Sequence, residues 1–310
     1  MFLPICVPGE AALRKNGMRT GNIFNRPGIV CSSAENTMNA RYPFLISIPH
    51  GGTEVPGEVR ARLLLSDEEL LFYCDPLTRE LFGFEDRVDA FIDTPVSRMI
   101  IDLNRPPLPL PPKDPDGVIK RRTVDGREIY RPGMVPPIDR IHELMMKHYF
   151  PYHQRIDELI DRYHVKAAFD CHSMLPYGSA VQKDAGKVRP MICLGNNGDG
   201  QGNPRPVSIA TCPADWMAAL AGAFRDEFSF DREVVFNDPF GGGFITNAHY
   251  WRKGIPWIQI EINRSLYESA GSGGHMQEKT RENVQVLKEK IWQVLTVFWK
   301  TVGDEKPDKN

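Results

Sequence analysis

The sequence predicts an α/β fold of three layers, in which helices cover both faces of a mostly parallel or mixed central sheet. Apolar, β-prone runs alternate with stretches of helical periodicity along the 310 residues, and this alternation is typical of α/β domains. Several of the runs lack outward polar alternation, which indicates strands that are buried on both faces. Polar side chains stand at or near the ends of three runs, and the carboxyl ends of such strands form the crevice where ligands bind.

Six runs are expected to be strands: residues 43–48, 96–103, 166–171, 189–194, 232–236 and 256–262. Helices are expected at residues 66–82, 139–163, 213–228 and 277–302, where apolar side chains recur at helical spacing. Ser66 and Glu69 match the capping box that opens a helix. Pro151 predicts a kink or a break within the second helix.

The domain organisation is expected to be simple. Residues 1–38 show no periodicity and are interpreted as an irregular or disordered extension. Residues 39–303 are expected to form a single catalytic domain, followed by a short tail at 304–310. Residues 106–137 are dense in proline, glycine and charge, and a loop of this length is often functional. We therefore expect this loop to cover the site, with a small hairpin at DGREIY.

Composition narrows the classes of function. The formal net charge is -2, with 25% charged residues, so the chain does not have the basic surface of a nucleic-acid or membrane-binding protein. No apolar run approaches the roughly 20 residues that a membrane span needs. The six cysteines have no CxxC spacing and are interpreted as reduced thiols of a cytoplasmic protein. The sequence does not specify an oligomeric state.

The chemistry-bearing residues follow or occupy the predicted strands. His50 lies in PHGGTE after the first strand, and His172 lies in FDCHS at the end of the third. A hydrolytic zinc site needs three protein ligands and an open position, which two histidines and one carboxylate could supply. Glu261 lies between two isoleucines in a strand that otherwise belongs to the core. A buried carboxylate is costly unless it is paired or functional, so Glu261 is the candidate general base.

The third ligand remains open between two carboxylates. Asp75 in FYCDPLTRELF is one candidate, although the residue could instead cap a helix at the break before Pro76. Glu54, four residues after His50, is the rival, unless it is a solvated loop charge. The remaining histidines are interpreted as structural or surface residues: His142, His148, His153, His164, His249 and His275.

Eight short motifs occur in one order: SIPHGGTEVP, CDPLTRELF, IIDLNRPP, VDGREIYRPG, YFPYHQRID, FDCHSM, GGGFITNAHY and IQIEINRSLY. The same motifs occur in the same order in the N-formylglutamate amidohydrolases, and the chain resembles this family over residues 44–267. The resemblance implies a zinc-exopeptidase-like fold, similar to zinc carboxypeptidases and aspartoacylase-like deacylases, with one zinc ion. It also implies hydrolysis of a small N-acyl amino acid, N-formylglutamate, to glutamate and formate in histidine degradation.

The resemblance assigns roles to individual positions. His50 and His172 match metal-binding histidines, and Asp75 matches an acidic position that we take as the third zinc ligand. Glu261 matches the expected general base, which takes the proton of the attacking water and passes it to the departing amine. Arg105 matches an arginine that holds a substrate carboxylate. The full set of candidate substrate-binding residues is Arg105, Arg98, Asn104, Arg252 and Asn263.

Two positions depart from the family pattern. Asn247 stands where the family usually has arginine, with Arg252 nearby, and INRSLY stands where LAQSTY is typical. Both lie where substrate identity is expected to be set. The sequence therefore leaves two alternatives: a related N-acyl amino acid deacylase or small-peptide carboxypeptidase, and a metal-free carboxylate-binding homologue.

Overall fold

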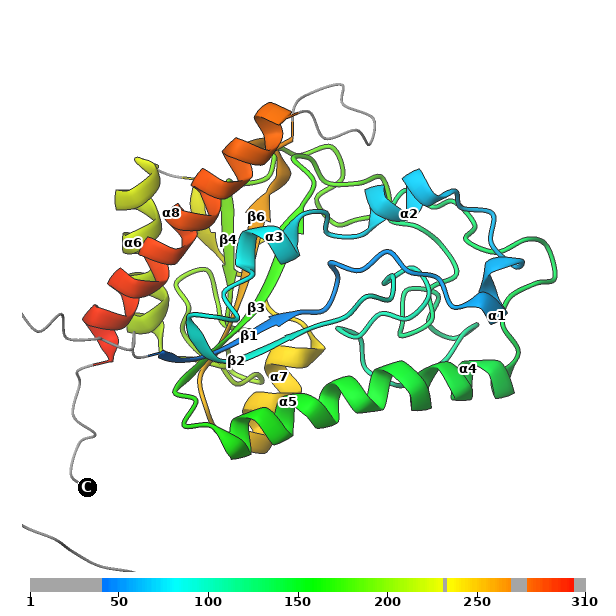
Figure 1. Cartoon of the computed structure of the whole chain (residues 1–310), viewed down its shortest axis with the longest axis horizontal. Helices are drawn as coiled ribbons and strands as arrows, with labels where there is room; N and C mark the ends of the chain where they lie inside the picture. Colours follow the sequence, from blue (N-terminus) through cyan, green and yellow to red (C-terminus); the bar gives the residue numbers. More distant parts are fainter. Residues whose placement is uncertain (1–40, 231–232, 269–277, 304–310) are drawn as a thin grey trace, which may run out of the picture. The chain divides into compact units, whose positions relative to one another are not determined.

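The computed structural model describes residues 41–230, 233–268 and 278–303, and a six-stranded mixed sheet lies at its centre (Figure 1). The strands are β1 (Tyr42–Ile48), β2 (Val88–Asp93), β3 (Ala167–Met174), β4 (Ile192–Gly195), β5 (Val234–Phe236) and β6 (Trp257–Asn263). Their order is β2-β1-β3-β6-β4-β5. β4 is antiparallel to β6, and the other neighbouring pairs are parallel. The predicted α/β class with a mixed sheet is confirmed.

Helices lie against both faces of the sheet. They are α1 (Gly57–Arg60), α2 (Asp67–Tyr73), α3 (Thr78–Phe82), α4 (Ile138–Leu144), the π-helical turn η1 (Met145–Tyr149), α5 (Phe150–Arg162), α6 (Ala214–Phe228), α7 (Phe244–Lys253), the 3-10 turn η2 (Arg264–Leu266) and α8 (Glu278–Val302). The first face packs against α3, α6 and α8. The second face packs against α7 and the long helix made of α4, η1 and α5.

The central strands are buried on both sides because each side meets a helical layer. In β1, Phe44 and Ile46 belong to the core beside α8, whereas Leu45 belongs to the core beside α5. Successive strand side chains point to opposite faces, so an uninterrupted apolar run fills both cores. In β3, Phe169 and Ala168 divide between the two cores in the same way.

The strand predicted at residues 96–103 is wrong. Residue Val96 makes only an isolated bridge with Glu54, and the residues after it form turns. The run is apolar because its side chains pack into the core beside α5, which needs no strand pairing. β2 takes the edge position instead, and its half-exposed alternating side chains gave only a weak apolar signal.

The predicted helix at residues 66–82 is two helices, α2 and α3, with a turn between them. The capping box of Ser66 and Glu69 is present as predicted. The predicted helix at 139–163 continues through η1, which directly precedes α5, where Pro151 lies in the first turn. A π-helical turn is one of the recognised ways to accommodate such a disruption. The sequence reading missed α7, which follows three glycines.

The proline-rich segment is largely irregular, with an antiparallel bridge between Arg122 and Glu128 that matches the predicted small hairpin. The expected extension at 1–38 and the tail at 304–310 lie outside the described residues. None of the helices in the described ranges is long and apolar enough to cross a membrane. The four cysteines within those ranges are buried, free thiols: Cys74, Cys171, Cys193 and Cys212.

Candidate active site

His50 is delivered to the site by the turn after β1. The chain turns sharply there because Gly52 packs against backbone: a Cβ on this residue would lie 2.3 Å from the carbonyl carbon of Pro95. The imidazole of His50 is buried, and its Nε2 lies 2.7 Å from Oδ1 of Asp102. That contact orients the ring so that Nδ1 lies 3.5 Å from Asp75 Oδ2.

His172 comes from β3 and is held in the same manner. Its Nε2 lies 2.9 Å from Oδ2 of Asp170, on the same strand. Asn104 donates from Nδ2 to that same carboxylate oxygen at 2.9 Å. Nδ1 of His172 lies 3.0 Å from Oδ2 of Asp75. Each histidine thus has one nitrogen on a carboxylate and the other directed at Asp75.

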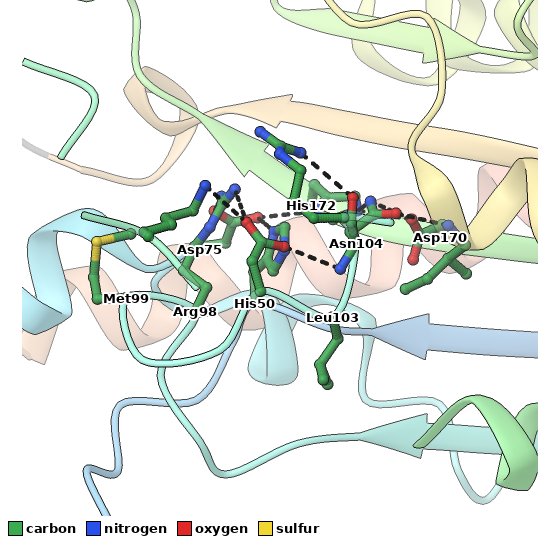
Figure 2. A network of polar contacts seen from close by, with 12 residues as sticks. His50, Asp75, Arg98, Met99, Leu103, Asn104, Asp170 and His172 are labelled. Carbon is green, nitrogen blue, oxygen red and sulfur yellow. Dashed lines mark hydrogen bonds and ion pairs between the residues drawn. The ribbon is translucent and has the colours of Figure 1, made fainter. Parts of the chain in front are cut away.

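Asp75 lies in the turn between α2 and α3 and completes the cluster. Figure 2 shows it beside His50 and His172, with Arg98 next to its carboxylate. Arg98 donates to Asp75 Oδ1 at 3.2 Å and to Asp102 Oδ2 at 3.0 Å. Burial opposes ionisation of Asp75, but the interactions with His172 and His50 hold its pKa well below the usual range. Asp75 is therefore an ionised carboxylate.

The three side chains fit a divalent metal ion. Each offers one ligand atom, and these atoms lie within 4.8 Å of one another. Nδ1 of His50 is buried without a hydrogen-bond partner, a costly state for a nitrogen that no ligand contacts. Zinc–ligand bonds of about 2.0–2.2 Å in a tetrahedron separate the ligand atoms by about 3.3–3.6 Å. The spacings of 3.0 and 3.5 Å around Asp75 are close to that requirement.

Glu261 lies beside the cluster because β6 pairs with β3 in a register that places it opposite His172. Gln259 donates from Nε2 to Oε1 of Glu261 at 2.8 Å. Burial raises the pKa of Glu261 to about 7, although the His172 charge opposes this rise. A carboxyl group with this pKa can both accept and release a proton near neutral pH.

A cavity of about 600 Å³ opens onto these residues. His50, Asp75 and Glu261 line it together with residues of the proline-rich segment and the glycine loop before α7. Six of the lining side chains are cationic: Arg98, Arg105, Lys120, Arg122, Arg189 and Arg264. Three are carboxylates: Asp75, Asp116 and Glu261. The excess of cations suits an anionic ligand.

Three predicted substrate-binding residues lie at this site, but their side chains are occupied to different degrees. Asn104 is buried, and its amide bonds to Asp170 and to the backbone N–H of Ile245, so it supports the cluster. Arg98 is bound to the two aspartates described above. Arg105 is half-buried and contacts Asp116 through Nε and Nη2. Of the two arginines, Arg105 has the guanidinium that is more open to a ligand.

Three other candidates lie elsewhere. Arg252 is on α7 with a side chain 70% exposed, pairs with Asp157, and lines a separate pocket. Asn263 caps η2 and bonds to the carbonyl of Pro190, so both ends of its amide serve the backbone. Glu54 is exposed and lines a pocket on another part of the surface. Arg252 and Asn263, predicted as substrate-binding residues, are therefore not among the residues that line the cavity.

The histidines interpreted as structural or surface residues are not part of the cluster of His50, Asp75 and His172 where the structure describes them. Nε2 of His249 bonds to Nδ1 of His153 at 2.9 Å, and His249 Nδ1 lies 2.9 Å from Oδ1 of Asp157. These contacts tie α7 to α5. His142 and His164 are exposed, and His275 lies outside the described residues.

Sequence reasoning missed several residues at the site. Asp102 is not among the predicted site residues, but its carboxylate lies 2.7 Å from Nε2 of His50 and orients the ring. Lys120, from the proline-rich segment, is buried and lies 3.1 Å from Oδ2 of Asp102. Gln259, Arg189 and Arg264 also line the cavity. Gln259 had a readable signal, because it stands two residues before Glu261 on the same strand. The other two depend on how distant loops meet.

An α/β sheet edge that brings together possible metal ligands, a buried acid–base carboxylate and a cation-rich cavity is typical of a hydrolase active site. Known proteins agree with this class. A family model described as N-formylglutamate amidohydrolase matches residues 42–268. The chain therefore belongs to the N-formylglutamate amidohydrolase family and is a hydrolase.

Individual relatives agree with the family. An N-formylglutamate deformylase of Pseudomonas aeruginosa is 28% identical over 73% of this chain and 82% of its own length. Another, of Pseudomonas putida, is 26% identical over 83% of this chain and 94% of its own. The crystal structure of an N-formylglutamate amidohydrolase from Ralstonia eutropha JMP134 shares 21% identity with a TM-score of 0.62, covering 83% of this chain and 94% of that one. This last likeness bears on the fold.

Replacing Asp102 with asparagine is expected to weaken the binding of a divalent metal ion such as zinc by about 10- to 100-fold, the usual effect of removing a partner that orients a ligand. The amide oxygen can still accept from His50 Nε2 but carries no full charge, so the contact that orients the ring is weakened. Zinc affinity can be measured by competition with a chelator. Asp116→Asn is the control, because Asp116 also pairs with Lys120 but contacts no histidine. Equal zinc affinities of the two variants would contradict the orienting role of Asp102.

Proposed function

We propose that this protein is a zinc-dependent cytoplasmic amidohydrolase that converts N-formyl-L-glutamate and water to formate and L-glutamate. The observation that carries the proposal is the buried cluster of His50, Asp75 and His172 beside Glu261 in a cation-rich cavity. Membership of the N-formylglutamate amidohydrolase family supports this substrate. The two deformylase relatives from Pseudomonas add to that support.

His50, Asp75 and His172 would hold one zinc ion through two imidazole nitrogens and a carboxylate oxygen. Zinc in such a site supplies Lewis acidity, which activates water and polarises a carbonyl at neutral pH. Asp102 and Asp170 keep the two imidazoles oriented, since each occupies the ring nitrogen that faces away from Asp75. The cluster is buried, so bulk water competes little with its contacts.

Glu261 is the proposed general base. It accepts a proton from the attacking water and then delivers that proton to the nitrogen of the departing amine, so that glutamate leaves as the neutral amine before ionising. Its pKa near 7, caused mainly by burial, suits both steps. Gln259 holds one carboxylate oxygen and so restricts the rotation of the side chain.

The cations of the cavity would bind the two carboxylates of the substrate. Arg105 is the first candidate, because its guanidinium is held by Asp116 along one edge and is half-exposed to the cavity. A guanidinium matches a carboxylate bidentately, which adds orientation to charge. Lys120 and Arg98 are already paired with buried aspartates, so they contribute chiefly to the positive electrostatic potential of the site.

A panel of N-acyl amino acids tests the substrate assignment. We expect kcat/KM to be highest for N-formyl-L-glutamate and to fall by about 10- to 200-fold for N-acetyl-L-glutamate, whose extra methyl group must fit the acyl pocket. N-formyl-L-glutamine is the matched control for the side-chain carboxylate, because it keeps the shape and removes the charge. N-formyl-aspartate and N-succinyl-glutamate test the chain length and the acyl group.

The outcomes separate the alternatives. Preference for an acetyl or succinyl group would indicate a related deacylase, and cleavage of short peptides would indicate a carboxypeptidase. Turnover that persists unchanged after chelation, with no zinc in the purified protein, would contradict the zinc mechanism. Binding of the panel without turnover of any member would indicate a carboxylate-binding homologue.

A further inference from the structure

Asp75 lies in a strained turn. The four residues between α2 and α3 read Cys74-Asp75-Pro76-Leu77. Leu77 has φ 63°, in the left-handed region, which is unfavourable for a residue with a side chain. A turn under strain keeps its shape only when its surroundings hold it. The backbone of Asp75 is tied by its N–H to the His50 carbonyl at 3.0 Å and by its own carbonyl to the Thr78 hydroxyl at 2.7 Å.

The carbonyls around Asp75 are bonded to two side chains from the other end of the chain. Arg264 donates from Nη1 to the Phe72 carbonyl at 2.8 Å and from Nη2 to the Cys74 carbonyl. Tyr267 donates its hydroxyl to the carbonyl of Pro76 at 2.9 Å. Cys74 and Pro76, the residues immediately before and after Asp75, are therefore both bonded to the short segment of residues 264–267.

The chemistry of these contacts is suited to holding the turn. The last carbonyls of a helix carry partial negative charge and lack partners within the helix. α2 has no basic residue in its last turn, so Arg264 supplies the cation from a distant part of the sequence. Its guanidinium also lies over the ring of Phe72, 5.9 Å from the centroid. Arg264 is 3% exposed and Tyr267 is 4% exposed, so water does not compete with these bonds.

The segment that carries Arg264 and Tyr267 is itself anchored. Asn263 accepts from the backbone N–H of Ser265 at 3.0 Å and donates to the carbonyl of Pro190 at 2.9 Å. The segment of residues 264–267 directly continues β6, the strand on which Glu261 lies. The proposed base and the contacts around the proposed ligand Asp75 thus share one rigid stretch of backbone.

We propose that Arg264 and Tyr267 are positioning residues that hold the Asp75 carboxylate at the spacing a zinc ion requires. This inference rests on the proposed zinc site. Without these contacts the strained turn relaxes, and Asp75 Oδ2 moves from its place between His172 and His50. Zinc affinity then falls, although all three ligands remain in the sequence.

The experiment measures zinc affinity by chelator competition in wild type, Arg264→Gln, Arg264→Lys and Tyr267→Phe. Tyr267→Phe removes one hydroxyl and keeps the aromatic ring in the core, so it tests the turn even if Arg264→Gln folds poorly. Arg225→Gln is the matched control: Arg225 also donates to a carbonyl, that of Val234, and it lies on α6, which packs on the face of the sheet opposite α5. The melting temperature of each metal-free protein and KM for N-formyl-L-glutamate are measured in parallel.

We expect zinc affinity to fall about tenfold in Arg264→Gln and in Tyr267→Phe, the lower end of the range for residues that support a metal ligand. Arg264→Lys keeps the charge on a single donor nitrogen and should lie between wild type and Arg264→Gln, whereas Arg225→Gln should bind zinc as wild type does. A raised KM with unchanged zinc affinity would overturn the proposal and make Arg264 a substrate-binding residue. Unchanged zinc affinity and KM would overturn it as well. If wild type binds no zinc, the zinc site itself is wrong, a result distinct from either of these.

Discussion

Replacing Glu261 with glutamine is expected to lower kcat by about 100- to 10,000-fold, the usual contribution of a positioned general base. The amide cannot accept the proton of the attacking water, and no other carboxylate lies opposite His172 across β3 and β6. Zinc content and KM should change little, because Glu261 is not among the three proposed ligands. Folding should also survive, since a neutral amide is less costly to bury than an ionised carboxylate.

The pH profile distinguishes a base from a merely structural carboxylate. Below its pKa, Glu261 is protonated and cannot act as the base, so wild-type kcat/KM should fall about tenfold per pH unit on the acid side. Burial raises that pKa to about 7, and a bound cation would move the acid limb lower by favouring the ionised form. The residual activity of Glu261→Gln should lack this limb. A variant that keeps more than a tenth of the wild-type kcat, with the same limb, would rule out this role.

Replacing His172 or Asp75 with alanine is expected to remove bound zinc and to abolish turnover. Either change leaves two ligand atoms where the site has three, and we expect zinc affinity to fall by at least about 100-fold, beyond the usual effect of losing an orienting partner. Asp75→Ala also leaves Arg98 with one carboxylate instead of two. Metal analysis of the purified variants, followed by titration with zinc, measures the effect.

Glu54→Ala is the matched control for Asp75→Ala. Both changes remove one carboxylate near His50: Glu54 is near it in the sequence, and Asp75 is near it in space. Glu54, however, is exposed and outside the cavity. Its loss should leave zinc affinity and kcat within about twofold of wild type, as is usual for a surface substitution. Loss of zinc from Glu54→Ala with retention in Asp75→Ala would mean that the ligand set has been assigned to the wrong carboxylate.

Periodicity predicted most of the fold because burial leaves a local record in the sequence. β3 and β6 are buried on both faces and rich in apolar residues, and α8 repeats apolar residues at helical spacing, so each could be recognised in isolation. The edge strand β2 is half-exposed and leaves a weaker record. Residues 96–103 mimic a strand because they are buried in a core without being paired. An apolar run indicates that its residues are buried, but it does not indicate that they pair with a neighbouring strand.

The candidate metal ligands followed from chemistry at strand ends, together with the family motifs. His50 and His172 stand at the carboxyl side of parallel neighbouring strands, which meet at one edge of the sheet. Asp75 was ambiguous with Glu54 because distance along the chain does not indicate which carboxylate turns inward. The turn after α2, which Arg264 contacts from 190 residues away, places Asp75 beside both histidines, whereas Glu54 is exposed.

By itself, the sequence determined the α/β class, the order of most elements, two histidines at strand ends and a carboxylate inside a core strand, because each of these is a local consequence of burial and chain direction. Only the tertiary structure decided that Asp102 and Asp170 orient the histidines, that Asp75 completes the cluster, and that Arg252 and Asn263 lie away from it. Those facts depend on contacts between segments far apart in the chain. The sequence could not predict them because side-chain direction and pairing in loops follow no periodic pattern.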